Sequence, residues 1–117
     1  MNKPYDKNRL NQAIKYSALD IDLKTWDDGL LHKIGSGGAL ISGGQKARIA
    51  FARCLYRDSD IYILDDIVSA LDSGVAAFIM KETIGKYLRG KTIILTTHNL
   101  STLPYSDHVI YMENGHI

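Results

Sequence analysis

The sequence predicts an α/β fold in which helices alternate with parallel strands. Two short runs, residues 61–64 and 92–97, are rich in apolar β-branched side chains, which is typical of strands buried on both faces of a parallel sheet. Each run follows a helical stretch, so the chain reads helix, strand, helix, strand. Polar side chains follow both runs, at the carboxyl edge where ligands collect in such sheets.

Composition sets broad limits. The 117 residues make at most one domain, or part of one, and the formal net charge of +1 comes with no basic stripe, so we expect no nucleic-acid partner. No apolar run approaches the length of a membrane span, and the first residues lack the core of a secretory leader. Cys54 is the single cysteine and the four histidines are scattered, so we expect a reducing compartment, no disulfide and no zinc site.

Before residue 41 the pattern predicts a small helical unit. Asp6 is the expected cap of its first helix, a second short helical turn follows, and residues 30–40 are irregular and glycine-rich. The apolar positions are Leu10, Ala13, Ile14 and Ala18 in the first helix and Ile21, Leu23 and Trp26 in the second.

Beyond the first strand the elements continue in the same alternation. A turn over residues 69–72 leads into a helix that ends near Tyr87, and the second strand follows. A helical turn over residues 99–103 is expected to stop at Pro104. Residues 109–112 then predict a strand that enters a tight hairpin at Asn114 and Gly115.

A helix that begins at Ser42 and runs to about Arg57 carries the first candidate site. Ser42 is a good N-cap, and glycines behind it leave the first backbone N–H groups unobstructed by side chains. With the helix dipole, such N–H groups favour a phosphate, although an ordinary capped surface helix has the same pattern. The residues of this tip are Ser42, Gly43, Gly44 and Gln45.

Asp65, Asp66 and His98 follow the two predicted strands, so we expect them at one sheet edge. One carboxylate can hold Mg²⁺ through its water, the second can orient or deprotonate an attacking water, and the imidazole can sense a terminal phosphate. The alternatives are two acids that cap the next turn and a core or rim histidine. Asp72 has a similar alternative as a simple helix cap.

Residues 85–92 match the P-loop pattern G-x-x-x-x-G-K-[ST] letter for letter. A working P-loop follows a strand and opens a helix, so that its N–H groups can cradle phosphates. Here a helix comes first and a strand follows, which places Lys91 and Thr92 at the amino edge of the sheet. We therefore interpret the match as chance.

Taken together, the motifs resemble the later half of an ABC-transporter ATPase domain. Residues 41–45 are similar to the family signature LSGGQ, with isoleucine for leucine, and residues 61–66 resemble its Walker B motif. Residues 69–72 resemble the D-loop, and His98 the switch histidine. The resemblance implies a partial P-loop NTPase (RecA-like) parallel sheet with flanking helices in residues 41–117, and part of the ABC helical subdomain in residues 1–40.

The resemblance also implies ATP and Mg²⁺ as ligands, in a head-to-tail dimer with a second ATPase domain. Ser42, Gly43, Gly44 and Gln45 would contact the γ-phosphate of a nucleotide bound by the partner. Asp66 and His98, as catalytic residues, and Asp65, as the magnesium residue, would serve the nucleotide on their own domain. Asp72, in the D-loop, would lie at the seam.

Within the family, the sequence around Asp65 and Asp66 resembles the first ATPase domain of multidrug-resistance-associated (C-subfamily) transporters. In that domain aspartate usually replaces the catalytic glutamate. Asp66 would then stand roughly 1.5 Å farther from its target than glutamate. We therefore expect slow hydrolysis, beside a more active partner domain. Two departures from the pattern are Ser36, where relatives often place acids, and the pair Ile67 and Val68, where Pro-Phe is common.

The Walker A half is absent, so we expect the second strand to present an open edge and the 117 residues alone to be inactive. Both ends of the sequence are expected to cut into a longer domain. The predicted function is that of an ATP-hydrolysing module of a membrane exporter, at the cytoplasmic face and in contact with transmembrane domains. The alternatives are a degenerate or regulatory half that completes a partner's ATP site, and a soluble ABC-type ATPase.

Overall fold

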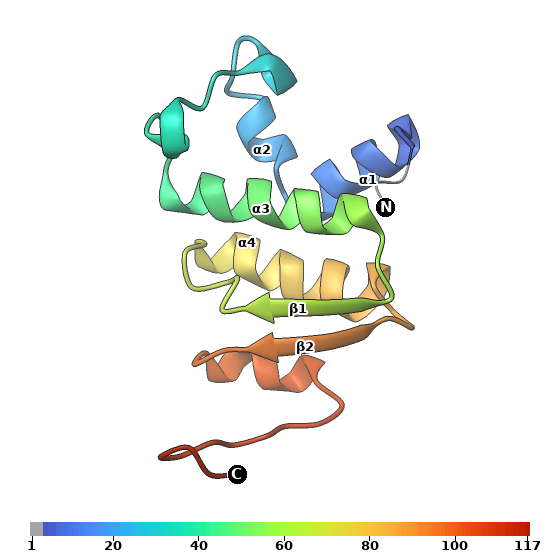
Figure 1. The fold of residues 1–117 in the computed structure, drawn as a ribbon, viewed down its shortest axis with the longest axis vertical. Helices are drawn as coiled ribbons and strands as arrows, with labels where there is room; N and C mark the ends of the chain where they lie inside the picture. The colour runs from blue at the N-terminus through green and yellow to red at the C-terminus, as the bar shows by residue number, and fades with distance from the viewer. Residues whose placement is uncertain (1–3) are drawn as a thin grey trace.

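A computed structural model describes residues 4–117; residues 1–3, the start of the expected helical part, lie outside the described residues. The elements alternate as the sequence predicts (Figure 1). In order they are α1 (Lys7–Tyr16), α2 (Asp20–Leu23), the 3₁₀ turns η1 (Gly29–Leu31) and η2 (Ser36–Gly38), α3 (Gly43–Arg57), β1 (Ile61–Asp65), α4 (Ser73–Phe78), the π-helical continuation η3 (Ile79–Tyr87), β2 (Thr92–Thr96) and the 3₁₀ helix η4 (Leu100–Tyr105).

The two strands lie side by side and parallel, which confirms the predicted fold class. Their register pairs Ile61 with Thr92 at one end and Asp65 with Thr96 at the other. Within the described residues the sheet contains these two strands, so the outer edge of β2 is open, as expected.

The core lies on one face of this sheet. Tyr62 and Leu64 point from β1 toward the helices, where they join buried side chains of α1, α3, α4 and η3. Ile93 and Leu95, their register partners on β2, pack against the same cluster. This face therefore holds the helices and the strands together.

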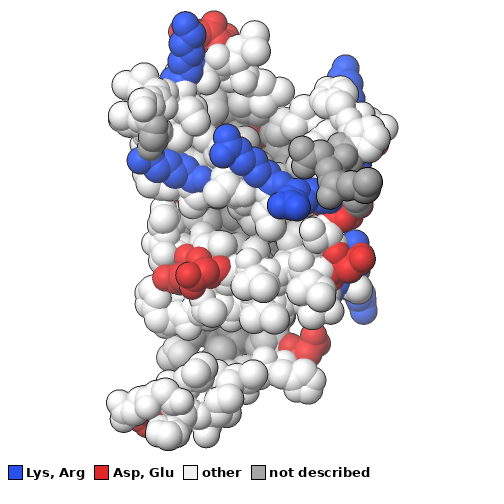
Figure 2. All heavy atoms as spheres, in the orientation of Figure 1, with Lys and Arg blue, Asp and Glu red and all other residues white. Residues whose placement is uncertain are grey.

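The opposite face of the sheet is exposed, which corrects the expectation that both strands are buried on both faces. Ile61, Ile63 and Ile94 are 60%, 73% and 53% exposed. Successive side chains of a strand point to opposite faces, and the helices of residues 4–117 that pack on the sheet meet the Tyr62 face. In Figure 2 the area over the two strands is largely uncharged, with Lys and Arg side chains mainly over the helices.

Local signals set the helix boundaries. Asp6 caps α1 by accepting the Arg9 N–H at 2.9 Å, as predicted. α3 ends at Arg57, as predicted, and Asp58 follows it as the C-cap in the left-handed conformation. Pro104 lies inside η4, which continues to Tyr105, so the expected stop at this proline is wrong.

The predicted strand over residues 109–112 is wrong. These residues are exposed and irregular, and a single bridge joins Glu113 to His116 around the turn at Asn114 and Gly115. The predicted turn is present, with φ values of 50° and 78° at those two residues. A strand needs a partner along its length, and an isolated hairpin is marginal in water.

The P-loop-like residues form a helix-to-strand loop, as interpreted from the sequence. Gly85 lies in η3 and Thr92 begins β2. The Lys91 ammonium lies 3.2 Å from Asp60 and 3.5 Å from Asp58, at the amino edge of the sheet. No helix in the described part of the chain is both long and apolar enough to cross a membrane.

Candidate nucleotide-binding edge

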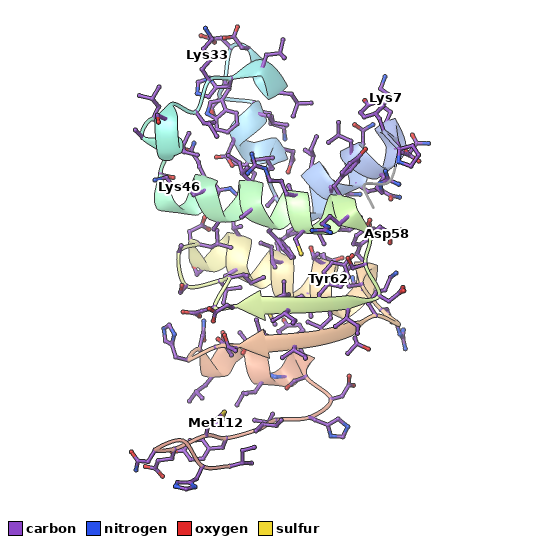
Figure 3. The ribbon with its side chains drawn as sticks, in the orientation of Figure 1. Lys7, Lys33, Lys46, Asp58, Tyr62 and Met112 are labelled. Atoms are coloured by element: carbon purple, nitrogen blue, oxygen red, sulfur yellow. The ribbon has the colours of Figure 1, made fainter. Side chains whose placement is uncertain are left out.

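The carboxyl ends of β1 and β2 and the start of α3 lie on the same side of the molecule (Figure 1). Figure 3 gives the orientation: Lys46 marks the start of α3, and Asp58 marks its opposite end, where the chain enters β1. The predicted site residues after both strands therefore share an edge with the predicted phosphate-binding helix tip. We call this side the carboxyl edge.

Asp65 ends β1 directly opposite Thr96 of β2. The Thr96 hydroxyl donates a hydrogen bond to Asp65 Oδ1, which fixes the carboxylate on the sheet while the residue stays exposed. Exposed carboxylate oxygens are the ligands that Mg²⁺ prefers, with water and phosphate oxygens to complete its shell. Within residues 4–117 no group of three or more His, Cys, Asp or Glu could hold a metal ion.

Asp66 turns the chain out of the sheet. Its φ is 46°, in the left-handed region that aspartate tolerates better than most residues, and its N–H donates to the Thr96 carbonyl at 2.9 Å. The side chain then meets the end of β2: its Oδ2 lies 3.2 Å from Nδ1 of His98. The left-handed turn is therefore what brings this carboxylate beside the imidazole.

The two partners of this pair differ in exposure. The His98 side chain is 78% exposed and that of Asp66 is 34% exposed. The Asp66 Oδ1 atom is buried and has no hydrogen-bond partner within residues 4–117. A buried carboxylate oxygen without a partner is costly, so this atom is suited to accept a hydrogen bond from a ligand or water.

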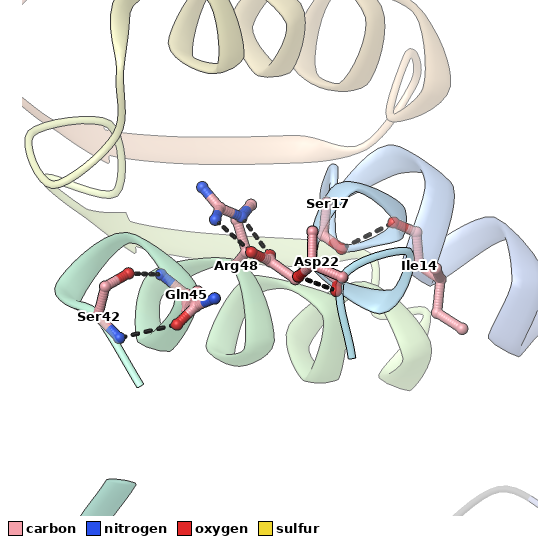
Figure 4. A network of polar contacts seen from close by, with 7 residues as sticks. Ile14, Ser17, Asp22, Ser42, Gln45 and Arg48 are labelled. Atoms are coloured by element: carbon pink, nitrogen blue, oxygen red, sulfur yellow. Dashed lines mark hydrogen bonds and ion pairs between the residues drawn. The ribbon is translucent and has the colours of Figure 1, made fainter. Parts of the chain in front are cut away.

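The tip of α3 is closed by a capping box (Figure 4). The Gln45 N–H donates to Ser42 Oγ at 3.2 Å, and the Ser42 N–H donates to the Gln45 side chain at 2.8 Å. Helix geometry leaves the N–H groups of Gly43 and Gly44 without an intrahelical acceptor. The cap residues are thus engaged within the helix, while two N–H groups of the tip remain for an anion.

The two glycines of the tip differ in what surrounds them. Among the described residues, a Cβ at Gly43 would meet nothing within 4 Å, whereas one at Gly44 would lie 3.1 Å from the Ala70 carbonyl oxygen. Gly44 therefore permits a close approach between α3 and the loop before Asp72. Asp72 itself caps α4 by accepting the Val75 N–H at 3.0 Å, the simpler of the two roles considered for it.

A cavity of about 340 Å³ lies between α3 and β1 and reaches Asp65 and Asp66. Its remaining lining is apolar and includes Phe51, Cys54 and Ile63. Burial raises the pKa of the Cys54 thiol, and nearby Arg57 only partly offsets this.

Sequence reasoning missed a buried ion pair between α2 and α3. Arg48 donates from Nε and Nη2 to the two carboxylate oxygens of Asp22, at 2.6 and 2.7 Å (Figure 4). Their side chains are 11% and 5% exposed, and the bond to Asp22 raises the pKa of Arg48. Neither residue stands in a motif, and a four-residue helix is too short for its periodicity to reveal a buried carboxylate.

Comparison with known proteins defines the class. Residues 6–69 match the family model described as "ABC transporter". The fold superposes on the "Structure of a bacterial Atm1-family ABC exporter with ATP bound" with a TM-score of 0.82 and 30% identity, over 90% of this chain and 18% of that one. The chain belongs to the ABC transporter family, and its partial P-loop NTPase fold agrees with the prediction.

The similar relatives also match the predicted subfamily. Mouse "ATP-binding cassette sub-family C member 4" is 43% identical over 113 residues, and the Drosophila melanogaster "Probable multidrug resistance-associated protein lethal(2)03659" is 41% identical over 117 residues. These alignments cover 97% and 98% of this chain. The chain spans 8% of the length of each relative.

Proposed function

We propose that this chain is the signature-bearing part of an ATP-binding module of a membrane exporter, in which ATP binding and hydrolysis are coupled to substrate export. The observation that carries the proposal is the carboxyl edge. There the Asp66–His98 pair at 3.2 Å, the Asp65 carboxylate and the start of α3 lie on the same side of the molecule. The likeness to an exporter titled as having ATP bound supports the same ligand.

On its own domain, the edge would act on the terminal phosphate of a bound ATP. Asp65 fits Mg²⁺, which when bound offsets the negative charge of the phosphates. Asp66 accepts the proton of the attacking water, and its partnerless Oδ1 is a suitable acceptor. His98 donates a hydrogen bond toward the γ-phosphate while its Nδ1 stays beside Asp66.

The tip of α3 would serve the nucleotide of a second ATPase domain in a head-to-tail dimer. The N–H groups of Gly43 and Gly44, and the hydroxyl of Ser42 once the cap opens toward the ligand, donate to its γ-phosphate. Asp72 lies in the loop beside Gly44 and would stand at the seam. The assembly would sit at the cytoplasmic face of the membrane, bound to transmembrane domains.

The second candidate function is a slow or regulatory ATP site on this chain's own domain, and the short side chain of Asp66 favours it. Its carboxylate is one methylene shorter than glutamate and already lies against His98. General bases work at contact distance, so a side chain that falls short transfers protons slowly. In that arrangement this domain holds its own ATP and mainly completes the faster site of the partner.

The test is Ser42→Asp in the full-length protein, with ATP turnover as the measurement. Aspartate keeps the N-cap and suits the helix dipole, so α3 stays formed. It also sets a carboxylate against the incoming phosphate, and we expect turnover to fall by about tenfold or more, since close like charges at an interface cost several kcal/mol.

Two matched variants separate the charge from other effects. Ser42→Asn keeps the cap without a charge but loses the hydroxyl, so its turnover should lie between those of the unchanged protein and Ser42→Asp. Asn11→Asp adds the same charge on an exposed position of α1, at the other end of α3, and should change nothing. Full turnover in Ser42→Asp would contradict the proposed role of the tip.

A further inference from the structure

Two different attachments join the helical unit of residues 4–34 to α3. Around α1 the attachment is apolar, because Ala13 and Ala18 belong to the same buried cluster as Phe51 and Leu55. In α2, by contrast, the one buried residue is Asp22. The second attachment therefore depends on an ion pair where a helix would ordinarily bury apolar side chains.

The geometry of this ion pair is directional. The Arg48 fork meets both oxygens of Asp22, at 2.6 and 2.7 Å, and both side chains are almost fully buried. The Asp22 carbonyl is also fixed, since it accepts the Thr25 hydroxyl at 2.8 Å. A two-point bond between planar groups defines both a distance and an orientation, whereas apolar side chains in contact can slide.

Arg48 also lies beside the tip of α3. It lies one helical turn after Gly44, and a Cβ on Gly44 would be 3.4 Å from Arg48 Nη1. The guanidinium is thus bonded to Asp22 on one side and lies near Gly44 on the other. A shift of α2 would be passed to the tip through this group.

We propose that Asp22 and Arg48 are positioning residues that hold the Ser42–Gln45 tip in register with the helical unit, and that this register determines how well the partner's site uses ATP. The inference rests on the proposed function of the tip. Neither side chain touches the nucleotide in this scheme; they act through the placement of the N–H groups of Gly43 and Gly44. Misplacement of a binding group by about 1 Å can cost about 100-fold in rate.

The experiment replaces both charges at once in the full-length protein. In Asp22→Leu with Arg48→Met, apolar side chains of similar volume take the place of a buried pair, a change that often preserves or raises stability. We expect an unchanged or higher melting temperature and a KM for ATP raised by about tenfold. Photo-crosslinked nucleotide on this chain's own domain should stay at its normal occupancy, because Asp65, Asp66 and His98 are untouched.

Two further variants sharpen the result. Arg48→Lys keeps the charge but loses the fork, and we expect an intermediate KM; this variant also keeps the proposal testable if the double variant does not fold. Asp20→Asn with Lys24→Gln removes the exposed pair of the same helix, whose atoms are 3.5 Å apart, and should leave KM unchanged.

A folded double variant with the original KM would overturn the inference, and so would a KM that rises only in step with lost stability. If the double variant does not fold, Arg48→Lys with the original KM would overturn it equally. Ser42→Asp is run in parallel. If that variant is fully active, the proposed function of the tip fails; if it is inactive while the Asp22 and Arg48 variants are normal, only the present inference fails.

Discussion

Asp66 combines a left-handed backbone with the shorter of the two acidic side chains. Its φ of 46° and its contact with His98 place the carboxylate at the end of the sheet. The backbone turn is easier for aspartate than for glutamate, because a short polar side chain tolerates this region. The same residue type that suits the turn therefore limits the reach of the base proposed here.

Lengthening this side chain should accelerate hydrolysis at the own site. In the full-length protein, Asp66→Glu extends the carboxylate by roughly 1.5 Å toward an attacking water. We expect the turnover of the own site to rise by about tenfold or more, because a positioned general base contributes about 10²- to 10⁴-fold. Single-turnover hydrolysis of ATP, resolved by domain, is the measurement.

Asp66→Asn is the matched control, since asparagine also tolerates the left-handed turn. If the own site is regulatory, this change should leave total turnover intact. If the turnover of this chain's own ATP site does not rise in Asp66→Glu and does not fall in Asp66→Asn, a role for Asp66 as a base is contradicted.

Cys54 offers a pH-dependent readout of the cavity between α3 and β1. Burial raises the pKa of its thiol, so the folded protein holds the proton more tightly than the unfolded chain. The resulting stabilisation is complete below the unfolded pKa and is lost as the pH rises through the folded one. We expect iodoacetamide to alkylate the folded protein more slowly than the urea-unfolded protein at pH near 8, with the difference narrowing as pH rises. Equal rates at that pH would contradict the burial.

At the scale of elements, the sequence predicts what local chemistry decides. Ser42 and Gln45 mark the start of α3 in the sequence, and Asp6 and Asp72 mark the starts of α1 and α4. These starts are predictable because each cap is a hydrogen bond between residues close in sequence. Asp65, Asp66 and His98 could be placed at one edge because parallel strands end together.

The remaining elements depend on contacts between distant residues. The Asp22–Arg48 pair spans 26 positions and has no local pattern. Residues 109–112 have the composition of a strand but no neighbour to pair with in residues 4–117. The exposed face of the sheet has the same origin, since composition cannot say which face of a strand is covered.

The close approach of α3 to the loop before Asp72 gives a prediction with an internal control. Gly44→Ala would set a methyl group 3.1 Å from the Ala70 carbonyl, which is backbone and cannot rotate away. Alanine gains about 1 kcal/mol over glycine in a helix, but crowding of this kind costs about 1–3 kcal/mol. We expect a net loss of stability of about 1 kcal/mol in thermal unfolding.

In Gly43→Ala the added methyl group meets nothing within 4 Å in residues 4–117, so stability should not fall and should rise by at most about 1 kcal/mol, the full value for a helix interior. Equal stability of the two variants would mean that the loop adjusts freely, and that Gly44 is not required by packing.

For the molecule as a whole, the uncovered face of the sheet decides how the chain behaves alone. Ile61, Ile63 and Ile94 form an exposed apolar surface beside the open edge of β2. Such surfaces mark interaction sites or aggregation hazards. The helices and the carboxyl edge are thus complete enough to be recognised, while one face of the sheet that supports them has no cover within residues 4–117.

We expect the 117-residue chain to self-associate at micromolar concentration, as molecules with exposed apolar strands do. Ile63→Lys, on the uncovered face, should raise the monomer fraction in sedimentation velocity. Leu31→Lys changes a residue that is even more exposed but lies in the helical unit, and should have little effect. A monomeric chain at about 100 μM, a concentration where such species associate, would contradict the prediction.

Lys91 belongs to a segment that matches the sequence pattern of a nucleotide-binding loop. Its ammonium, however, forms ion pairs with Asp58 and Asp60 at the amino edge of the sheet, away from His98. A substitution of this lysine that is meant to abolish ATP binding would instead remove the ion pairs between the end of α3 and the start of β2. A loss of activity in such a variant would therefore not identify Lys91 as a phosphate-binding residue.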